Sequence, residues 1–314
     1  MTVKANFPPT FIKRVHTIFG DAGQAWLPTL PALIARCREK WSLAESEICP
    51  TLRMNYIEFA ITAEGVPVAL KIGVPHKELF TEITTLKLYD GNAAVRLLDA
   101  DLTLGAMLLQ RLQPGTMLYQ LSDNEAETQI AAKIMKKLLL APPHAHNLPK
   151  FSQWVDRAFH LTRTSWDPQG EKMPAHLVNR AEQAFRKIEQ SVQPEVVLHG
   201  DLHHENILFD DKRGWLAIDP KGVVGPACLE VGRFLQNQLS SDDPLEHRAD
   251  IVQRRIDIFS SELAYDPQVI IASGFVDCVL SLCWGFEETE LSSDWFQGLE
   301  LAHWFSDSLK LERL

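Results

Sequence analysis

Apolar positions recur along this chain with two different periods. In residues 8–41 they return every three or four positions, as at Phe11, Val15 and Ile18, which predicts helix. The next part shows short extended runs in which apolar and polar positions alternate, with one helical stretch among them. The expected strands are 51–62, 66–73, 93–101 and 105–112, and the expected helix is 76–89. The pattern therefore predicts a small antiparallel sheet with one helix between its strands.

The period changes near Gln113, and from Leu121 onward helical spacing dominates. Ser122 is followed three residues later by Glu125, the spacing of a capping box at a helix start. The later expected helical stretches are 149–161, 174–191 and most of 226–312. We therefore expect an α+β chain with two lobes, in which 1–112 carries the N-terminal helices and the sheet, and 113–314 is mainly helical.

Composition narrows the classes of protein to consider. The 314 residues are 46% hydrophobic, and the formal net charge is −10 with no basic run, which argues against nucleic-acid binding. No window of eighteen apolar residues lacks a charge, so we expect no membrane span. The five cysteines are scattered without a CxxC pair, which indicates free thiols and a cytoplasmic location.

The run VLHGDLHHENILF, residues 197–209, concentrates polar chemistry between apolar ends. Two strand-like runs follow each other here, ILF and WLAI, joined by the turn sequence DDKRG. A hairpin would bring Asn206 and Asp219 together at its open end, with Asp201 on the preceding loop. Their oxygens are hard ligands that suit magnesium. A polar turn between core strands and a zinc site built on the histidines are the alternatives, although HExxH is missing.

His-x-Asp-x-x-x-x-Asn followed by a further Asp is the catalytic-loop spacing of kinases. HGDLHHENIL with AIDPKG resembles the aminoglycoside phosphotransferase family, in particular its streptomycin 6-kinase and hydroxyurea phosphotransferase group. The resemblance implies a two-lobed protein-kinase-like fold that uses ATP and Mg²⁺. It implies that Asp201 accepts the acceptor's proton, that Asn206 and Asp219 hold magnesium, that His199 orients the loop, and that His203 reaches the transferred phosphoryl group.

The same resemblance assigns nucleotide contacts in the first lobe. Lys71, on the strand VPVALKI, would hold the phosphates, and Glu82 on the following helix would orient it. The backbone C=O of Gln110 and the N–H of Leu112 would meet the adenine edge. The run TLRMNYIEF, residues 51–59, departs from the pattern because it has no glycine. The lack of an APE-type segment favours a small-molecule kinase over a protein kinase.

The acceptor site is expected in the helical lobe. Glu230 and Arg233 lie on one predicted helix face, and Asp277, Trp284 and Glu287 cluster near the end of another helix. The resemblance implies a small and cationic acceptor such as streptomycin, with hydroxyurea as the neutral possibility. Glu230 and Arg233 could instead pair with each other or brace the catalytic loop. A kinase for a sugar, an amino alcohol or a ketosamine, or a nucleotide-binding pseudokinase, remains the alternative function.

Overall fold

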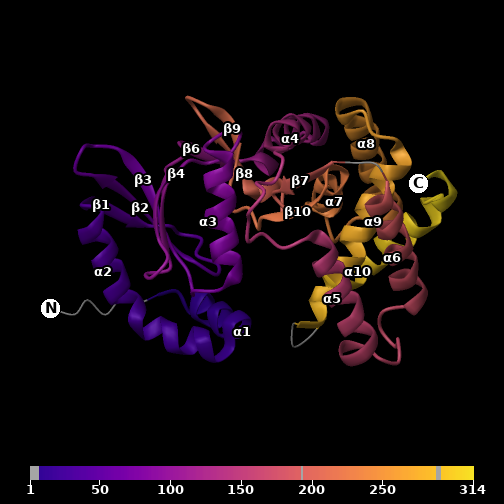
Figure 1. Ribbon diagram of the computed structural model, residues 1–314, viewed down its shortest axis with the longest axis horizontal. Helices are drawn as coiled ribbons and strands as arrows, with labels where there is room; N and C mark the ends of the chain where they lie inside the picture. The colour runs from indigo at the N-terminus through magenta and orange to yellow at the C-terminus, as the bar shows by residue number, and fades with distance from the viewer. Residues whose placement is uncertain (1–6, 192–193, 288–290) are drawn as a thin grey trace. The chain divides into compact units, whose positions relative to one another are not determined.

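The computed structural model describes residues 7–191, 194–287 and 291–314, with the side chain of Glu287 excepted. The chain divides into two compact units, Met1–Gly115 and Thr116–Leu314 (Figure 1). The change from sheet to helix in the sequence placed a boundary after Leu112. The described part follows the α+β architecture expected from the sequence, with a five-stranded antiparallel sheet in the first unit and mostly helices in the second.

The first unit is built on a sheet of strand order β1-β2-β3-β5-β4, in which every neighbouring pair is antiparallel. Its strands are β1 (Leu43–Ile48), β2 (Tyr56–Thr62), β3 (Pro67–Ile72), β4 (Leu97–Asp101) and β5 (Ala106–Gln110). The β2–β3 hairpin was predicted, and Gly65 at its turn has φ of 80°. Strand β1 was not expected, because four of its six residues are charged or small and five are exposed.

The helical stretch expected at 8–41 is confirmed, and it is divided into two helices. The chain forms α1 (Pro9–Trp26), the short 3-10 turn η1 (Leu27–Thr29) and α2 (Leu30–Lys40). Pro28, inside η1, has no backbone N–H to continue the helical ladder, and Gly20 adopts a positive φ of 51° within α1. These breaks let the helices follow the sheet, so that both contribute to its apolar core.

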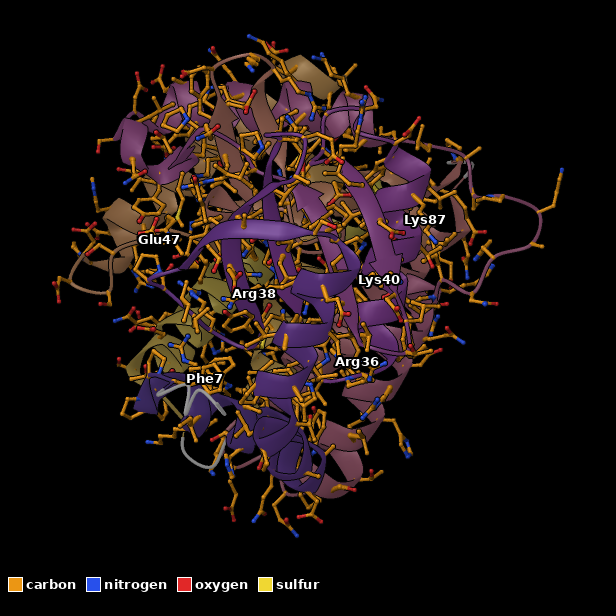
Figure 2. All side chains as sticks on the ribbon, turned by 90° about the vertical axis from the view of Figure 1, so that its left-hand side faces the viewer. Phe7, Arg36, Arg38, Lys40, Glu47 and Lys87 are labelled. Carbon is orange, nitrogen blue, oxygen red and sulfur yellow. The ribbon has the colours of Figure 1, made fainter. Side chains whose placement is uncertain are left out.

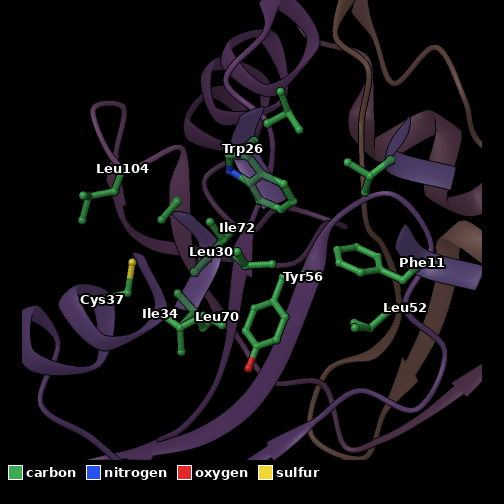
Figure 3. Packing of buried hydrophobic residues seen from close by; sticks show 13 residues of the cluster. Phe11, Trp26, Leu30, Ile34, Cys37, Leu52, Tyr56, Leu70, Ile72 and Leu104 are labelled. Atoms are coloured by element: carbon green, nitrogen blue, oxygen red, sulfur yellow. The ribbon is translucent and has the colours of Figure 1, made fainter. Parts of the chain in front are cut away.

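Apolar side chains of α1 and α2 pack on one face of the sheet (Figure 3). Phe11 and Leu30 from the helices meet Tyr56 and Leu70 from the strands, and all four are essentially inaccessible to solvent. Burying a side chain of this size stabilises the folded state by roughly 1.5–3 kcal/mol. The helices are therefore fixed against the sheet by ordinary hydrophobic burial.

Two ion pairs also join α2 to the sheet, and Figure 2 shows Arg38 and Lys40 on that helix. The guanidinium of Arg38 donates two hydrogen bonds to the carboxylate of Glu58 on β2, at 2.9 and 2.7 Å. Nζ of Lys40 lies 2.6 Å from Oδ2 of Asp101 on β4. Bidentate arginine pairs fix orientation as well as distance, so α2 is held in one register on the sheet.

The two faces of β3 differ, as its alternating sequence predicts. Val68, Leu70 and Ile72 are fully buried in the apolar core. Lys71 points to the opposite face, where its ammonium group meets Glu82 of α3 (Lys77–Tyr89). The expected helix at 76–89 is confirmed, and it carries the partner of the strand lysine.

The second unit combines helices with two small sheets. One sheet pairs β7 (Glu195–Leu198) with β10 (Val223–Pro226), and in the other β8 (Ile207–Asp210) pairs with β9 (Gly214–Ala217). Strand β6 (Pro114–Met117) spans the boundary between the two units. The helices are α4 (Asn124–Leu138), α5 (Phe151–Leu161), α6 (Ala175–Gln190), α7 (Gly232–Gln236), α8 (Leu245–Leu263), α9 (Pro267–Trp284) and α10 (Ser293–Ser308). Short 3-10 or π turns connect them, namely η2 (Leu118–Leu121), η3 (Thr162–Trp166), η4 (His204–Asn206), η5 (Ala227–Val231), η6 (Gly285–Glu287) and η7 (Leu311–Arg313).

Helix α9 is the core helix of this unit and contacts α5, α6, α7, α8 and α10 (Figure 1). Its mean hydropathy of 1.5 over eighteen residues would be high enough for a membrane span, yet 72% of this window is buried inside the protein. From the sequence we expected no membrane span, because every window of eighteen residues contains a charge. In α9 that charge is Asp277. Burial by neighbouring helices accounts for its apolar composition.

The start of α4 differs from the predicted capping box. The N-cap is Asp123, whose carboxylate accepts a hydrogen bond from the backbone N–H of Ala126 at 3.1 Å. Ser122 has a φ of 54° and ends η2 instead. Both residues are good N-caps by type, and the positive φ of Ser122 removes it from the cap position.

Arg255 of α8 is a completely buried cation. Its Nη1 donates to the backbone oxygens of Phe234, Leu235 and Asn237, at 2.9, 3.0 and 2.7 Å. These carbonyls end α7 and have no partner within the helix. Burial lowers the pKa of Arg255 to about 10, so the side chain stays charged at neutral pH. The short helix α7 is therefore fixed in place by a side chain from a different helix.

Replacing Arg255 with Met should destabilise the second unit, because it leaves buried carbonyl groups without donors. We expect a loss of at least about 3 kcal/mol in the free energy of unfolding, since each orphaned group costs roughly 1–3 kcal/mol. For a unit of this size that corresponds to a fall in Tm of about 6–12 °C, measured by circular dichroism. Arg254→Met is the matched control, because Arg254 is the adjacent residue and is exposed. Equal effects of the two substitutions would contradict the capping role of Arg255.

Candidate active site

The loop after β7 carries the polar run of the sequence, and it leads into the hairpin of β8 and β9. Strands β8 and β9 pair with Ile207 opposite Ala217, and the backbone N–H of Ile218 donates to the carbonyl of Asn206 at 2.9 Å. The residues on either side of the hairpin, Asn206 and Asp219, therefore lie at its open end. Nδ2 of Asn206 also donates to the backbone oxygen of Asp201 at 2.9 Å. The structure brings Asp201, Asn206 and Asp219 into one region, as the hairpin argument predicted.

His199 is fully buried and orients the loop through both ring nitrogens. Nε2 lies 2.8 Å from the carbonyl oxygen of Ile218 and must donate to it, because that oxygen is an acceptor. Nδ1 accepts from the backbone N–H of Asp201 at 3.2 Å. Burial lowers the pKa of His199 to about 4, so the ring is neutral at physiological pH. The backbone oxygen of His199 in turn accepts from the N–H of Lys221 at 2.8 Å, which joins the two polar loops.

The carboxylate of Glu230 binds the backbone of the same loop. Its Oε2 accepts from the backbone N–H of His199 at 2.6 Å and its Oε1 from that of Gly200 at 3.2 Å. Burial raises the pKa of Glu230 to about 7, and the two amide hydrogen bonds act in the opposite direction. Both oxygens of this buried carboxylate are engaged by the loop backbone. Glu230 therefore takes the bracing position that the sequence left as an alternative, and it does not face an acceptor.

Gly200 must be glycine at its place in the loop. Its φ is 77°, in the left-handed region that side chains rarely adopt. A Cβ there would lie 2.9 Å from Cγ1 of Val223 and 3.1 Å from the ring of Trp154. The loop can therefore turn between Val223 and Trp154, and this turn directs the next residue, Asp201, outward as a partly exposed side chain.

The two neighbouring histidines have different surroundings. Nε2 of His203 lies 4.0 Å from Oδ1 of Asp201, and its Nδ1 accepts from the backbone N–H of Glu205 at 3.3 Å. His204 is fully buried and stacks on Phe234 with ring centroids 3.9 Å apart. Nη2 of Arg255 donates to Nε2 of His204 at 3.3 Å, and burial holds the pKa of this histidine well below its usual value. His203 therefore lies beside Asp201, whereas His204 is a neutral core residue.

Asp219 has a backbone φ of 58°, which is unusual for a residue with a side chain. Such strain costs on the order of 1–3 kcal/mol and is characteristic of functional sites. The side chains that could hold a cation here offer a carboxylate from Asp219 and an amide oxygen from Asn206. Two hard oxygen donors suit Mg²⁺, which keeps several water or phosphate ligands. In the parts of the chain that the structure describes, no group of three or more His, Cys, Asp and Glu residues suits a metal, so the zinc alternative has no ligand set.

On the other side of Asp201 lies Arg233 of α7. Its Nε is 3.3 Å from Oδ1 of Asp201 and 3.5 Å from Oδ2 of Asp277 on α9. Its guanidinium lies over the ring of Trp284, 5.8 Å from the centroid, and Trp284 meets Trp154 edge to face at 5.7 Å. Arg233 therefore lies beside Asp201, and Trp284 lies beside Arg233; both were predicted near the acceptor. The predicted acceptor residue Glu287 has a side chain outside the described part of the structure.

In the first unit, the expected ion pair is present. Nζ of Lys71 lies 2.6 Å from Oε1 of Glu82, and both residues are buried, at 2% and 7% exposure. Gln110 ends β5, and its backbone N–H donates to the oxygen of Arg96 at 2.9 Å. Leu112 follows as a half-buried residue outside any strand.

For two residues the sequence did not predict the contacts that the structure shows, namely Asp277 and Arg255. Asp277 had been placed in an acidic cluster, whereas it is 5% exposed and pairs with Arg233. Its signal was present as the lone charge in the apolar segment PQVIIASGFVDCVLSLCW. Arg255 had received no role, although it lies between the apolar residues Val252 and Ile256 on the buried face of α8.

The comparisons with known proteins agree with this geometry. Residues 40–288 match the family described as aminoglycoside/hydroxyurea antibiotic resistance kinase. The chain is 28% identical over 250 residues to a streptomycin 6-kinase of Streptomyces griseus, covering 79% of this chain and 80% of that protein. It is 27% identical over 278 residues to a hydroxyurea phosphotransferase of Kitasatospora aureofaciens, with 87% and 78% covered.

The fold is similar to that of the choline kinase LicA from Streptococcus pneumoniae, with a TM-score of 0.64 at 13% identity over 88% of this chain and 99% of that one. The protein-kinase-like fold predicted from the sequence is thereby confirmed. Because the family match spans most of the chain, the chain belongs to the aminoglycoside/hydroxyurea antibiotic resistance kinase family and is a phosphotransferase.

Proposed function

We propose that this protein transfers the γ-phosphoryl group of ATP, in the presence of magnesium, to a hydroxyl group of a small molecule such as streptomycin or hydroxyurea. The observation that carries this proposal is the placement of Asp201, Asn206 and Asp219 around one hairpin. Phosphoryl transfer needs a base beside the acceptor and hard oxygen ligands for the cation, and this arrangement supplies both. The two relatives' names supply the acceptor candidates.

The phosphates of the nucleotide are assigned to Lys71. A lysine that is nearly fully buried stays charged only when a partner compensates its desolvation, and Glu82 lies within hydrogen-bonding distance. This partner also fixes the ammonium group in one position. A fixed cation is what an incoming triphosphate needs, because the attraction then requires no rearrangement of the site. Gln110 and Leu112 are proposed to meet the adenine through their backbone groups.

Magnesium is assigned to Asn206 and Asp219. When bound, it would neutralise charge on the phosphates and help to orient them for transfer. The chain's own contribution is to hold the two oxygen donors still. The hydrogen bond from Nδ2 of Asn206 to the backbone of Asp201 limits rotation of the amide, and it leaves the amide oxygen as the donor for a cation.

Asp201 is assigned as the residue that accepts the proton of the acceptor hydroxyl. Its carboxylate is partly exposed at the end of a loop that Glu230 and His199 hold by hydrogen bonds. The acceptor oxygen then attacks the γ-phosphorus as the bond to the β-phosphate oxygen breaks, and ADP leaves. His203, 4.0 Å from the same carboxylate, is proposed to contact the transferred group.

The acceptor is assigned to the surface beside Asp201 that carries Trp284. We place the protein in the cytoplasm, where ATP is supplied. The most direct test is to measure ADP release with purified protein and a panel of streptomycin, other aminoglycosides, hydroxyurea, sugars and amino alcohols. Turnover of streptomycin or hydroxyurea at rates well above hydrolysis by water supports the proposal. Preference for a sugar, an amino alcohol or a ketosamine would replace the acceptor class, and nucleotide binding without turnover of any acceptor would indicate a pseudokinase.

Asp201→Asn should reduce kcat by about 10²–10⁴-fold, the usual contribution of general-base catalysis. The affinity for ATP should change little, because Asp201 is assigned to the acceptor. Steady-state kinetics and nucleotide titration by calorimetry measure the two quantities separately. Asp211→Asn, in the exposed hairpin turn, is the control for loss of a carboxylate. A variant that keeps more than a tenth of the wild-type kcat would remove Asp201 from the reaction.

Asp219→Ala should abolish the part of nucleotide binding that depends on magnesium. In a thermal-shift titration, ATP with magnesium should raise the Tm of the wild type and of Asp211→Ala, but not that of Asp219→Ala. A ligand at a hundred times its Kd stabilises a protein by about 2.7 kcal/mol, so the difference is measurable. Adding EDTA to the wild type should reproduce the mutant result. Equal stabilisation of the mutant and the wild type by magnesium and ATP would show that the metal assignment is wrong.

A further inference from the structure

A chain of polar side chains leads from the core helix α9 to Asp201. Nε of Arg233 lies between two carboxylates, 3.3 Å from Oδ1 of Asp201 and 3.5 Å from Oδ2 of Asp277. Nη1 of Arg233 donates to Oγ of Ser281 at 2.8 Å, and that hydroxyl donates to the backbone oxygen of Asp277 at 2.8 Å. The guanidinium is thus hydrogen-bonded to α9 through Ser281, and its Nε lies at ion-pair distance from the carboxylates of Asp277 and Asp201 without a hydrogen bond to either.

The Asp277 carboxylate is costly where it lies. It is buried in an otherwise uncharged helix, and burial raises its pKa while the nearby guanidinium of Arg233 lowers it. The side-chain amide of Gln236 donates to the same carboxylate. Apolar residues of equal volume would generally give a core at least as stable as a buried ion pair. The pair therefore calls for an explanation other than stability, and its contact with Asp201 provides one.

Helix α7 approaches α9 closely enough to set this geometry. A Cβ on Gly232 would lie 2.6 Å from Cβ of Asp277 and 2.7 Å from the backbone oxygen of Ser273. Only glycine fits without displacing backbone there. Arg233 directly follows Gly232. Glu230, two residues before Gly232, accepts hydrogen bonds from the backbone of the catalytic loop. The short segment 230–233 therefore contacts that loop twice. The carboxylate of Glu230 binds the loop backbone, and the guanidinium of Arg233 lies against the side chain of Asp201.

We propose that Arg233, held by Asp277 and Ser281, is a positioning residue that keeps the carboxylate of Asp201 in the orientation needed to accept the acceptor's proton. This inference rests on the proposed role of Asp201. It reassigns Arg233, which the sequence had placed among the acceptor contacts. A carboxylate at the end of a loop can rotate about two bonds, and misplacement by about 1 Å costs on the order of 10²-fold in rate. An ion pair to a guanidinium held from the core limits this rotation.

The test compares kcat and KM in Arg233→Met and Asp277→Asn. Arg233→Met should lower kcat by about 30- to 100-fold, and Asp277→Asn by about 10-fold, whereas KM for ATP and for the acceptor should stay within about threefold of wild type. Because Asp277 acts through Arg233, adding Asp277→Asn to Arg233→Met should cost less than about twofold more. Arg233→Lys keeps the charge without the planar group, and its kcat should fall between those of wild type and Arg233→Met.

The acceptor in the assay is streptomycin or hydroxyurea, whichever gives faster ADP release. Hydrolysis of ATP by water is measured as well, because it needs no acceptor. Arg186→Met is the matched control, since Arg186 lies on α6 and its ion pairs are with Asp156, Glu182 and Glu189. It should behave as wild type. Thermal unfolding of each variant shows whether it is folded, and the cycle with Arg233→Lys replaces that with Arg233→Met if the latter does not fold.

Three results would overturn the inference. The first is a raised KM for the acceptor with unchanged kcat in Arg233→Met, which would make Arg233 an acceptor contact. The second is an undiminished effect of Asp277→Asn in the background of either Arg233 variant. The third is an unchanged kcat in both Arg233→Met and Arg233→Lys. Asp201→Asn in the same assays distinguishes failure of the proposed function from failure of the positioning role. An active Asp201→Asn contradicts the proposed function. An inactive Asp201→Asn with an active Arg233→Met contradicts only the positioning role.

Discussion

The buried carboxylate of Glu230 is the contact on which the geometry of the polar loop depends. It accepts hydrogen bonds from the backbone N–H groups of the buried His199 and the partly buried Gly200. An orphaned backbone donor costs about 1–3 kcal/mol, so the loop is strongly biased towards this one conformation. His199 can then reach the carbonyl of Ile218, and Asp201 is directed out of the core. The hairpin with Asn206 and Asp219 is connected to the same backbone through Ile218 and Lys221.

The buried charges of the described residues are compensated in different ways. Lys71 meets the carboxylate of Glu82, Arg233 lies between Asp201 and Asp277, and Arg255 donates to backbone carbonyls of α7. Ion pairs of this kind contribute little net stability, because desolvation offsets most of their attraction. They do impose direction, since each charged group has one arrangement in which its partners are satisfied. Positions around Asp201 are therefore determined by polar groups, while apolar burial in α9 and the sheet supplies most of the stability.

Much of the fold could be predicted because the signals involved are local. The alternation in β3 showed which face carries Lys71, and the turn between ILF and WLAI placed Asn206 near Asp219, since both depend on spacing within a few residues. The predictions that failed needed information from outside the segment. Ser122 lost the cap position to Asp123 because of its backbone conformation. Strand β1 has a polar sequence and is a strand because β2 pairs with it.

By itself the sequence determined the kinase-type spacing of Asp201, Asn206 and Asp219, the lysine on its strand, and the change from sheet to helix, because each of these is a property of neighbouring residues. Only the tertiary structure decided what Glu230, Arg233, His204 and Asp277 do. Their types allow an acceptor contact, a surface charge or a core position equally well, and the choice depends on which distant segment packs against them. Residues 31 positions apart meet at His199 and Glu230, and 44 separate Arg233 from Asp277. Contacts over such separations arise from the packing of whole elements, which the spacing of residues along the chain does not encode.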